Sequence, residues 1–492
     1  MMEKMMGGAP QAGMPAEPVE KEKQATPKTE FEGFVDCPLF AEDAKITLNN
    51  EGLLIAARFD QLPVPYGEIA AFYLTDNRVE IQTAACTVTA SRMGQNAEWL
   101  YQKLYGAYND AVLEALLVEG KHDFEAAGAY IAEENGRTRQ GPAILRLYED
   151  CLCILPPDQH ARRVPLCFLT AAEKTGHSLT LTLSTGERYT LSKLGRELDN
   201  LERLLTDGLR SLRERTLAWL GELAPNLGSM QGAVAAKLMP LGTAAMLTKL
   251  SAAAPPLATA LEEQIEDSRM AQTYPWLRDL CGGQGLCIGA LPPPKQQEEG
   301  QPAMPGPAAM PGFPSMPPQM APPQQPAEPA TGQSAEAEKP KPILWAIAPD
   351  REQQVAAVEL ALTDGEAAAT YLYRVEGEWE SFARIIDRAL EAASFQREVI
   401  LLPEAELNAP EHLPQAMLVR RTPALALLRS HFAGRAIHSS PDRWRRDIEK
   451  CRTTAPTTRT DAPVQTKPRF CTNCGAALAP GVKFCGQCGS PQ

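Results

Sequence analysis

The chain has 492 residues, of which 44% are hydrophobic, so it is long enough to form several domains with packed cores. Its 61 acidic side chains outnumber its 48 basic ones, and the formal net charge of −13 argues against nonspecific binding of the whole protein to nucleic acid or to anionic membranes. Residues 1–34 lack the apolar stretch of a signal peptide and are expected to form a disordered tail. We therefore expect a cytoplasmic protein whose thiols stay reduced.

An internal repeat with a period of about one hundred residues follows the tail. The dipeptide Val64-Pro65 recurs as Val164-Pro165, and the flanking apolar runs recur in the same order at offsets from 99 to 101. Because order and spacing are both kept, the sequence predicts two copies of one fold.

Both copies have the same order of predicted elements. Runs in which apolar and polar residues alternate, such as 78–82 and 179–183, predict half-buried antiparallel strands. A long amphipathic helix then ends each copy, at about 96–117 and 194–220. Such a helix is expected to close the open end of a bent sheet.

This order of elements resembles that of two tandem pleckstrin-homology-like (PH-like or GRAM-like) domains, at 35–119 and 138–220. The resemblance implies domains that bind phosphoinositides in some families and peptides or proteins in others. Lipid-binding members are expected to gather Lys and Arg between their first two strands, whereas the matching loops here, 49–52 and 148–150, are polar or acidic. Protein interaction, or a structural pairing of the two copies, is therefore favoured over lipid binding.

Two charged pairs in the second copy are interpreted as solvated groups. Arg162 and Arg163 are the one observation that would favour binding of an anionic lipid by the second copy. We interpret them instead as two solvated arginines beside a strand. Glu133 and Glu134 lie in a charged run that is expected to form a solvated helix face. Neither pair is predicted to form a site.

The middle of the chain changes composition twice. Residues 221–290 are rich in Ala, Leu and Met and are broken by prolines, which predicts a helical connector. Residues 291–342 are rich in Pro and Met and cannot bury enough apolar surface to offset chain entropy, so we expect disorder. Since 285–290 also has the pattern of a strand, two interpretations stay open. The Pro-rich segment is either a linker between domains or an insertion between adjacent strands of one domain.

A third folded region of α+β type is predicted at 343–451, followed by a flexible basic neck at 452–469. From Arg435 to Arg469 the sequence has nine Lys or Arg residues and four Asp or Glu residues, so this part is basic within an acidic protein. The elements predicted in the region are strands at 343–348, 355–362, 367–375 and 399–402, with a helix at 379–393.

Four cysteines near the C-terminus form two C-x2-C pairs, Cys471 with Cys474 and Cys485 with Cys488. Four thiolates at this spacing fit a closed, tetrahedral and therefore structural zinc site, so we expect one Zn²⁺. Disulfide pairing of the same cysteines is the alternative, and it is disfavoured because nothing in the chain points to secretion. The stretch 470–492 resembles the zinc ribbon found at the C-terminus of many bacterial proteins.

The expected fold class is multi-domain α+β: two PH-like β-rich domains each closed by a C-terminal helix, a helical connector, a third α+β domain and a C-terminal zinc ribbon. The sequence has no P-loop, G-x-G-x-x-G, G-x-S-x-G, H-E-x-x-H or kinase motif, so we expect no enzyme and infer no small-molecule substrate. The resulting hypothesis is a non-enzymatic adaptor that binds an unidentified protein partner. The alternatives are a nucleic-acid-associated protein that uses the neck with the ribbon, and a peripheral membrane protein that uses the PH-like pair.

Overall fold

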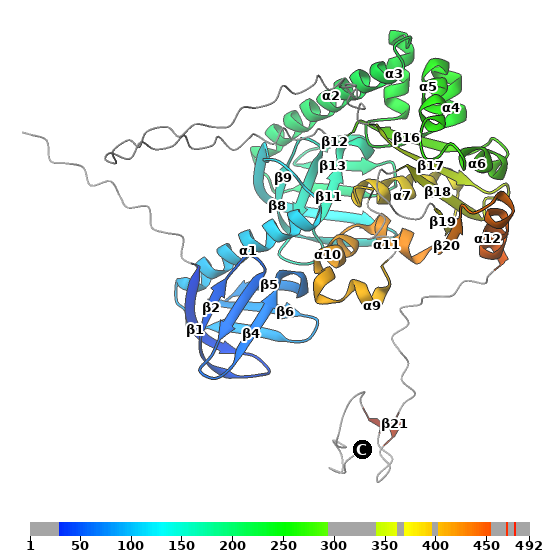
Figure 1. The fold of residues 1–492 in the computed structure, drawn as a ribbon. Coiled ribbons are helices and arrows are strands. Elements are labelled where there is room, and N and C mark those ends of the chain that lie inside the picture. Colours follow the sequence, from blue (N-terminus) through cyan, green and yellow to red (C-terminus); the bar gives the residue numbers. More distant parts are fainter. Residues whose placement is uncertain are drawn as a thin grey trace, which may run out of the picture. The chain divides into compact units, whose positions relative to one another are not determined.

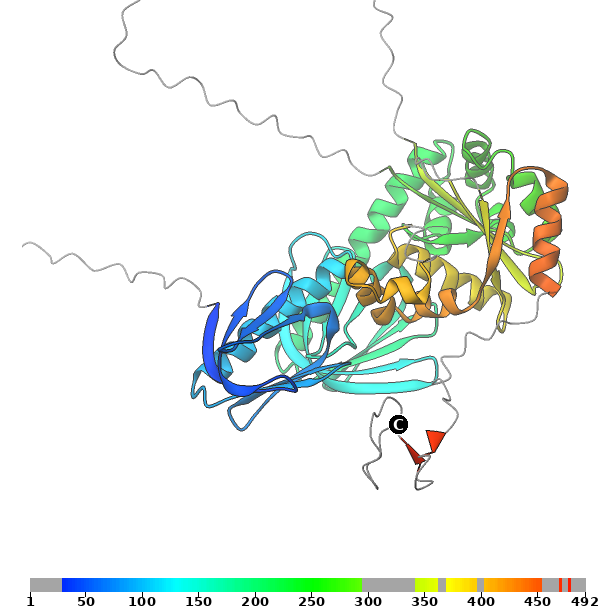
Figure 2. The ribbon, with the colours of Figure 1, turned by 60° about the horizontal axis from the view of Figure 1, so that its bottom comes forward.

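The computed structural model describes residues 29–293, 341–361, 369–395, 402–453, 469–470 and 477–478. The fold is mixed α+β, and its strands form antiparallel sheets (Figures 1 and 2). The chain divides into two compact units, residues 1–111 and 112–492.

The first unit is a seven-stranded sheet, with strand order β4-β3-β2-β1-β7-β6-β5, followed by the helix α1. Figure 1 shows its strands in blue. The bounds of its elements are β1 Glu30–Asp36, β2 Ala41–Leu48, β3 Gly52–Ala56, β4 Gln61–Pro65, the 3-10 helix η1 Tyr66–Glu68, β5 Ile69–Thr75, β6 Arg78–Thr83, β7 Thr87–Ser91 and α1 Asn96–Ala115.

Aromatic packing holds α1 against this first sheet. Phe72 of β5 is fully buried and contacts Tyr101, Tyr105 and Tyr108 of α1, with ring centroids 5.6, 5.5 and 5.2 Å away. These tilted and edge-on pairs add to the free energy gained by burying the rings. The predicted closing helix is thus fixed by the residues at its inward-facing positions.

The second unit begins with a sheet of the same strand order, β11-β10-β9-β8-β14-β13-β12, followed by the helix α2. The two sheets thus share the strand order, and each is followed by a long helix, as the predicted repeat requires. The bounds are β8 Phe124–Glu134, β9 Arg137–Leu147, β10 Cys151–Leu155, β11 Arg162–Pro165, the 3-10 helix η2 Leu166–Phe168, β12 Leu169–Thr175, β13 Ser178–Leu183, β14 Arg188–Ser192 and α2 Glu197–Leu223.

The spacing between equivalent residues changes in steps along the repeat. Gly33 of β1 lies opposite Ala44, and its equivalent Gly128 lies opposite Ala143, so the offset grows from 95 to 99 across the first hairpin. The β8–β9 hairpin is thus four residues longer than the β1–β2 hairpin. One further residue in the loop after β10 and one in the loop after β13 raise the offset to 100 and then 101.

This uneven spacing explains two corrections to the sequence analysis. The first strand starts at Glu30, inside the range 1–34 that was predicted to be a tail, and β8 starts at Phe124, ahead of the boundary predicted at 138. A search for matches at offsets near 100 cannot align β1 with β8, because their residues are 95 apart.

Gly33 and Gly128 are required by close packing at equivalent points of the two sheets. A Cβ at Gly33 would lie 2.9 Å from the carbonyl oxygen of Ser91, and a Cβ at Gly128 would lie 2.9 Å from that of Ser192. A backbone oxygen cannot move aside as a flexible side chain can. Glycine is therefore the residue that lets β1 and β8 approach β7 and β14.

A six-stranded sheet, in the order β15-β16-β17-β18-β19-β20, follows in the second unit. The strands and the helix predicted at 343–348, 355–362, 367–375 and 379–393 are confirmed as β17, β18, β19 and α7, whereas residues 399–401 lie outside the described residues. The bounds are α3 Ser229–Leu238, β15 Ala244–Met246, α4 Leu247–Ala253, α5 Pro255–Glu266, α6 Tyr274–Cys281, β16 Cys287–Leu291, β17 Ile343–Pro349, β18 Val355–Ala361, β19 Ala369–Arg374, α7 Trp379–Ala392, α9 Glu404–Leu407, the 3-10 helix η3 Pro410–His412, α10 Leu413–Arg421, α11 Pro423–Ser430, β20 Phe432–Ile437 and α12 Pro441–Thr453.

The pairing of β16 with β17 decides between the two interpretations of the Pro-rich segment. Leu291 lies opposite Ile343, and Cys287 lies opposite Ile347, so the two strands are neighbours in one sheet. The segment between them is therefore an insertion in one domain. The helical connector predicted at 221–290 is also corrected, because β15 and β16 are strands of this sheet.

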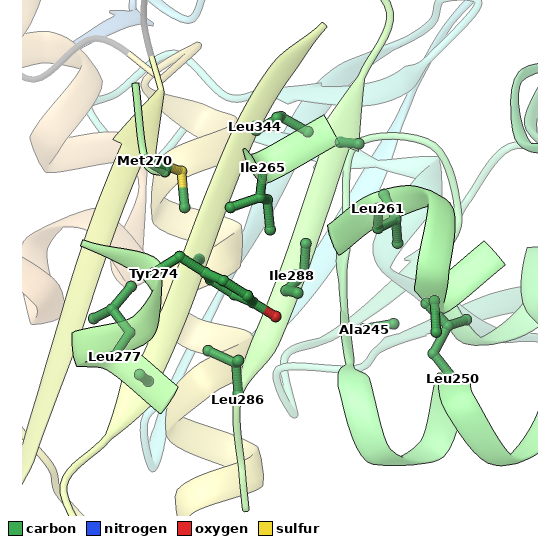
Figure 3. Close-up of a cluster of buried hydrophobic side chains, with 14 of the residues drawn as sticks. Ala245, Leu250, Leu261, Ile265, Met270, Tyr274, Leu277, Leu286, Ile288 and Leu344 are labelled. Atoms are coloured by element: carbon green, nitrogen blue, oxygen red, sulfur yellow. The ribbon is translucent and has the colours of Figure 1, made fainter. Parts of the chain in front are cut away.

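Helices cover both faces of the six-stranded sheet, which is why β17 and β18 are buried almost without interruption. On one face, Figure 3 shows Ile288 and Leu344 of the sheet beside Ile265 of α5, all three at most 1% exposed. On the other face, Trp345 packs against Phe395, which follows α7, with ring centroids 4.5 Å apart.

The helix α2 joins the two sheets of the second unit. Leu201 near its start belongs to the core of the β8–β14 sheet, and Leu220 near its end belongs to the core of the six-stranded sheet. A helix of 27 residues is about 40 Å long, so one rigid element spans both cores.

Candidate functional site

A buried ion pair lies at one end of the β8–β14 sheet. Glu134, the last residue of β8, accepts hydrogen bonds from Nε and Nη2 of Arg162 at 2.6 and 2.8 Å, and Oε1 also accepts one from the hydroxyl of Tyr189 at 2.8 Å. The side chains of Glu134 and Arg162 are 3% and 4% exposed. Burial alone would raise the pKa of Glu134, but the hydrogen bonds and the charge of Arg162 outweigh burial and lower this pKa.

The sequence analysis was wrong about these charged residues. Glu134 belongs to a strand and not to a solvated helix face, and Arg162 is buried in β11. Arg163 is not solvated either, because it pairs with Glu391 of α7 at 2.5 Å and with Asp150 at 2.7 Å. Glu133 is exposed, as expected for the neighbouring position on a strand.

Charged side chains of α7 bind the β8–β14 sheet to the six-stranded sheet. Arg388 donates to Glu391 Oε2 at 2.8 Å and to the carbonyl oxygen of Arg163 at 2.7 Å. The side chains of Arg163, Arg388 and Glu391 are 10%, 5% and 11% exposed. Buried charges destabilise a protein unless they are paired, so this arrangement favours one relative placement of the two sheets.

Asp387, on the same helix, is a buried carboxyl group with neutral partners. Its Oδ2 accepts a hydrogen bond from the backbone N–H of Ala244 at 2.7 Å, and Oδ1 accepts one from Trp345 Nε1 at 2.9 Å. Burial raises the pKa of Asp387 to about 7. The adjoining cavity, which Cys287 also lines, has a volume of about 20 Å³ and has room for a water molecule but not for a substrate.

A second buried polar cluster joins α12 to the six-stranded sheet. The hydroxyl of Thr370 donates to Glu359 Oε2 at 2.7 Å, accepts from Trp444 Nε1 at 2.8 Å and lies 3.0 Å from His438 Nε2. A hydroxyl beside a histidine and a carboxylate has the residue types of a nucleophilic centre. However, Thr370 has no exposed surface, so in this conformation the cluster serves to hold α12.

Further ion pairs fix α12, which contains part of the basic region that begins at Arg435. Arg452 pairs with Asp350, Glu352 and Glu449 at 2.8, 2.7 and 2.9 Å, and Arg445 pairs with Asp279 at 2.9 Å. Arg452, which the sequence analysis placed in the flexible neck, therefore lies on a folded helix and has its charge paired. Residues 454–468 of the predicted neck lie outside the described residues.

A short hairpin lies close to the C-terminus. The strands β21 Arg469–Phe470 and β22 Ala477–Leu478 pair antiparallel, with Arg469 opposite Leu478 and Phe470 opposite Ala477. The first C-x2-C pair therefore belongs to the segment that connects the two strands. All four predicted ligands, Cys471, Cys474, Cys485 and Cys488, lie outside the described residues, and their role stays a prediction.

Residues 470–492 match the family model of the zinc-ribbon domain. The chain carries a zinc-ribbon domain at its C-terminus. A comparison of the whole chain with curated proteins finds no matching relative. A zinc-ribbon domain implies zinc binding, and the donor set fits, since two pairs of thiolates are the preferred ligands of a closed Zn²⁺ site.

Elsewhere, the described ranges contain no group of three or more His, Cys, Asp or Glu side chains that can hold a metal ion. Two cysteines of these ranges, Cys151 and Cys153 of β10, act as small packing groups. Both are fully buried, with sulfur atoms 4.0 Å apart, and this contact together with burial raises the pKa of the Cys151 thiol. Within the same ranges, no helix has the length and apolar character needed to cross a membrane.

Proposed function

We propose that the protein is a non-enzymatic adaptor, in which the zinc-ribbon domain docks onto a protein partner and the folded units provide a scaffold. The match of residues 470–492 to the zinc-ribbon family carries this proposal. In it, Cys471, Cys474, Cys485 and Cys488 hold one structural Zn²⁺. Zinc binding would supply most of the folding free energy of so short a domain, on the order of 10 kcal/mol.

The charge of the ribbon favours a protein partner over a nucleic acid. Four thiolates and one Zn²⁺ carry a formal charge of −2, and Lys483 is the one charged side chain between residues 470 and 492. A module of this kind has little attraction for phosphate groups. The ion pairs of Arg445 and Arg452 reduce the basic character of the neighbouring region as well.

The attachment of the ribbon also suits a docking role. Trp444 and Arg452 fix α12 to the six-stranded sheet, and α12 ends at Thr453. The 15 residues from 454 to 468 can extend at most about 50 Å. In this proposal, the ribbon binds its partner within about that distance of the end of α12.

We further propose that both seven-stranded sheets are PH-like domains that bind protein. Their shared strand order and the helix that follows each sheet support this assignment. The β2–β3 loop contains Glu51, which disfavours binding of anionic lipids there. In the equivalent β9–β10 loop, Glu149 and Asp150 pair with Arg215 and Arg163, both at 2.7 Å, so this loop gathers no excess of positive charge.

The adaptor hypothesis is tested with the full-length protein. Crosslinking in a host lysate identifies a partner, which is then purified and titrated against the wild type and a Cys471→Ser/Cys474→Ser variant. We expect about one zinc per chain and measurable partner affinity in the wild type, with both lost in the variant. A Cys37→Ser/Cys86→Ser variant changes two half-buried cysteines away from the ribbon and should keep both properties. Unchanged partner affinity in the zinc-free variant would contradict docking through the ribbon.

A second candidate function is binding to a membrane surface through the first unit, as two exposed apolar side chains suggest. Leu39, in the loop after β1, is 62% exposed, and Phe59, in the loop after β3, is 85% exposed. A hydrogen bond from the backbone N–H of Arg58 to Glu42 at 2.9 Å places the two loops at the same end of the sheet. Flotation of the full chain with vesicles of phosphatidylserine and phosphatidylcholine tests this function. Binding that falls with a Leu39→Ser/Phe59→Ser variant would support it, and failure of the wild type to float would eliminate it.

A further inference from the structure

A cavity of about 370 Å³ opens between the β8–β9 hairpin and the helices α10 and α11. Among the described residues that line it, Glu134 supplies a carboxylate, and Asn135 and Ser430 add uncharged polar groups. Four arginines also line it: Arg137, Arg139, Arg162 and Arg420.

The single carboxylate of Glu134 cannot balance the guanidinium groups of Arg137, Arg139 and Arg162. Both of its oxygens accept hydrogen bonds from Arg162, and Arg139 Nη1 lies 3.5 Å from Oε2. Arg137 comes from the start of β9, and Arg420 comes from α10, where a hydrogen bond to Asn408 Oδ1 at 2.8 Å is one of its contacts. The lining is therefore strongly cationic, although the protein as a whole carries a formal charge of −13.

Arg162 is held in place before any ligand arrives. Its side chain is 4% exposed, and three of its N–H groups donate to the two oxygens of Glu134 and to the carbonyl oxygen of Ala161. A guanidinium group has five N–H donors, so these bonds leave two. A fixed donor group binds an anion without the entropy loss of ordering a free side chain.

The cationic lining is specific to the second copy of the repeat. Glu134, Arg137 and Arg139 lie in the part of the β8–β9 hairpin by which it exceeds the β1–β2 hairpin, and Arg162 occupies the position of Leu62. The shared fold does not require any of these residues. Their convergence on one cavity is thus an added feature of this copy.

We propose that the cavity binds a small phosphate-containing anion, with Arg137, Arg139 and Arg420 supplying positive charge and Arg162 supplying fixed N–H donors. The planar guanidinium fork matches the oxygens of a phosphate group in geometry and in charge. Pro423, Ala426 and Leu427 line the same cavity, which suits a phosphate ester whose organic part contacts an apolar wall. This site is separate from the docking role proposed for the ribbon.

Calorimetric titration of the full chain tests the proposal with three probes at constant ionic strength: inorganic phosphate, pyrophosphate and glycerol phosphate. We expect saturable binding of at least one probe, and affinity at least about tenfold lower in an Arg137→Gln/Arg420→Gln variant. Both positions are exposed, so the variant should fold with an unchanged far-UV spectrum. Preference for pyrophosphate would identify a diphosphate as the ligand, and preference for glycerol phosphate would identify a monoester.

The matched control is an Arg203→Gln/Arg210→Gln variant, which removes two arginines of α2 that are 63% and 64% exposed. It should bind the probe as the wild type does. Absence of binding to all three probes would overturn the proposal, and so would equal loss of affinity in the two variants.

Discussion

The two seven-stranded sheets have the same strand order, yet their equivalent hairpin loops have opposite character. In the first unit, the loops after β1 and β3 present Leu39 and Phe59 to solvent. In the second, the β8–β9 hairpin continues into a buried ion pair between Glu134 and Arg162. One backbone pattern therefore supports an apolar, exposed end in one copy and a charged, buried end in the other.

The difference between the two loop ends depends on a few residue positions and on the length of the first hairpin in each copy. Arg162 replaces Leu62, Tyr189 replaces Val88, and Glu134 lies in the longer β8–β9 hairpin. The comparison teaches that the strand register is set by features common to both copies, whereas the burial of each loop end is set by the elements that surround it.

The largest predicted effect comes from making the second copy resemble the first at one position. Arg162→Leu leaves Glu134 buried without its partner, and we expect a loss of about 3–5 kcal/mol in the free energy of unfolding. Urea denaturation of the full chain measures this loss as a lower midpoint for the second unit.

The double variant Glu134→Leu/Arg162→Leu sharpens this test, because it removes both buried charges together. It should recover most of the lost stability, since an apolar pair can replace a buried ion pair at little expense. A single variant as stable as the wild type would show that the ion pair is not buried in solution.

A pH dependence should also distinguish the two units. Among the described residues of the first unit, no carboxyl group is buried, whereas Asp387 of the second unit has a pKa of about 7. The folded pKa lies above the ordinary value of 3.8, so the stability that protonated Asp387 contributes is fully present below about pH 4 and is lost as the pH rises through 7. The total loss is at most about 4 kcal/mol.

Denaturation of the wild type and Asp387→Asn at several pH values measures this effect. The stability difference between them should shift in favour of the variant between about pH 4 and pH 7. Asp60→Asn, at an exposed position of the first unit, serves as the control and should show no such shift. A constant difference across the range would contradict the raised pKa of Asp387.

The smallest predicted effect tests what the two copies share. Gly33→Ala and Gly128→Ala each place a Cβ 2.9 Å from a backbone oxygen, so each should cost about 1–3 kcal/mol. Comparable losses of unfolding free energy, measured by urea denaturation of the first unit for Gly33→Ala and of the second unit for Gly128→Ala, would support equivalent packing of β1 against β7 and of β8 against β14. A loss confined to one copy would break the equivalence.

Local pattern predicted a large part of the fold. Alternation along 78–82 and 179–183 marked the strands β6 and β13, and the apolar stripe at 379–393 marked α7, because these periods reflect the geometry of the element itself. The pattern did not predict the burial of Glu134, because the sequence does not distinguish a buried glutamate with a charged partner from a solvated one. Burial alternates at Tyr130, Ala132 and Glu134 of β8, but the sequence shows no matching alternation of apolar and polar residues there.

The candidate sites also divide into those that the sequence predicted and those that only the structure revealed. The sequence alone determined the zinc-ribbon domain, because all four candidate ligands lie within one short segment and their spacing is itself the signal. It also indicated the repeat, whereas the order in which the strands pair came from the structure. Only the tertiary structure decided that residues 287–291 and 343–347 pair across the Pro-rich insertion, and that Arg163 contacts Glu391, 228 positions away. Periodicity reports which face of an element is apolar, whereas burial of a charge depends on distant residues that the chain brings together only when it folds.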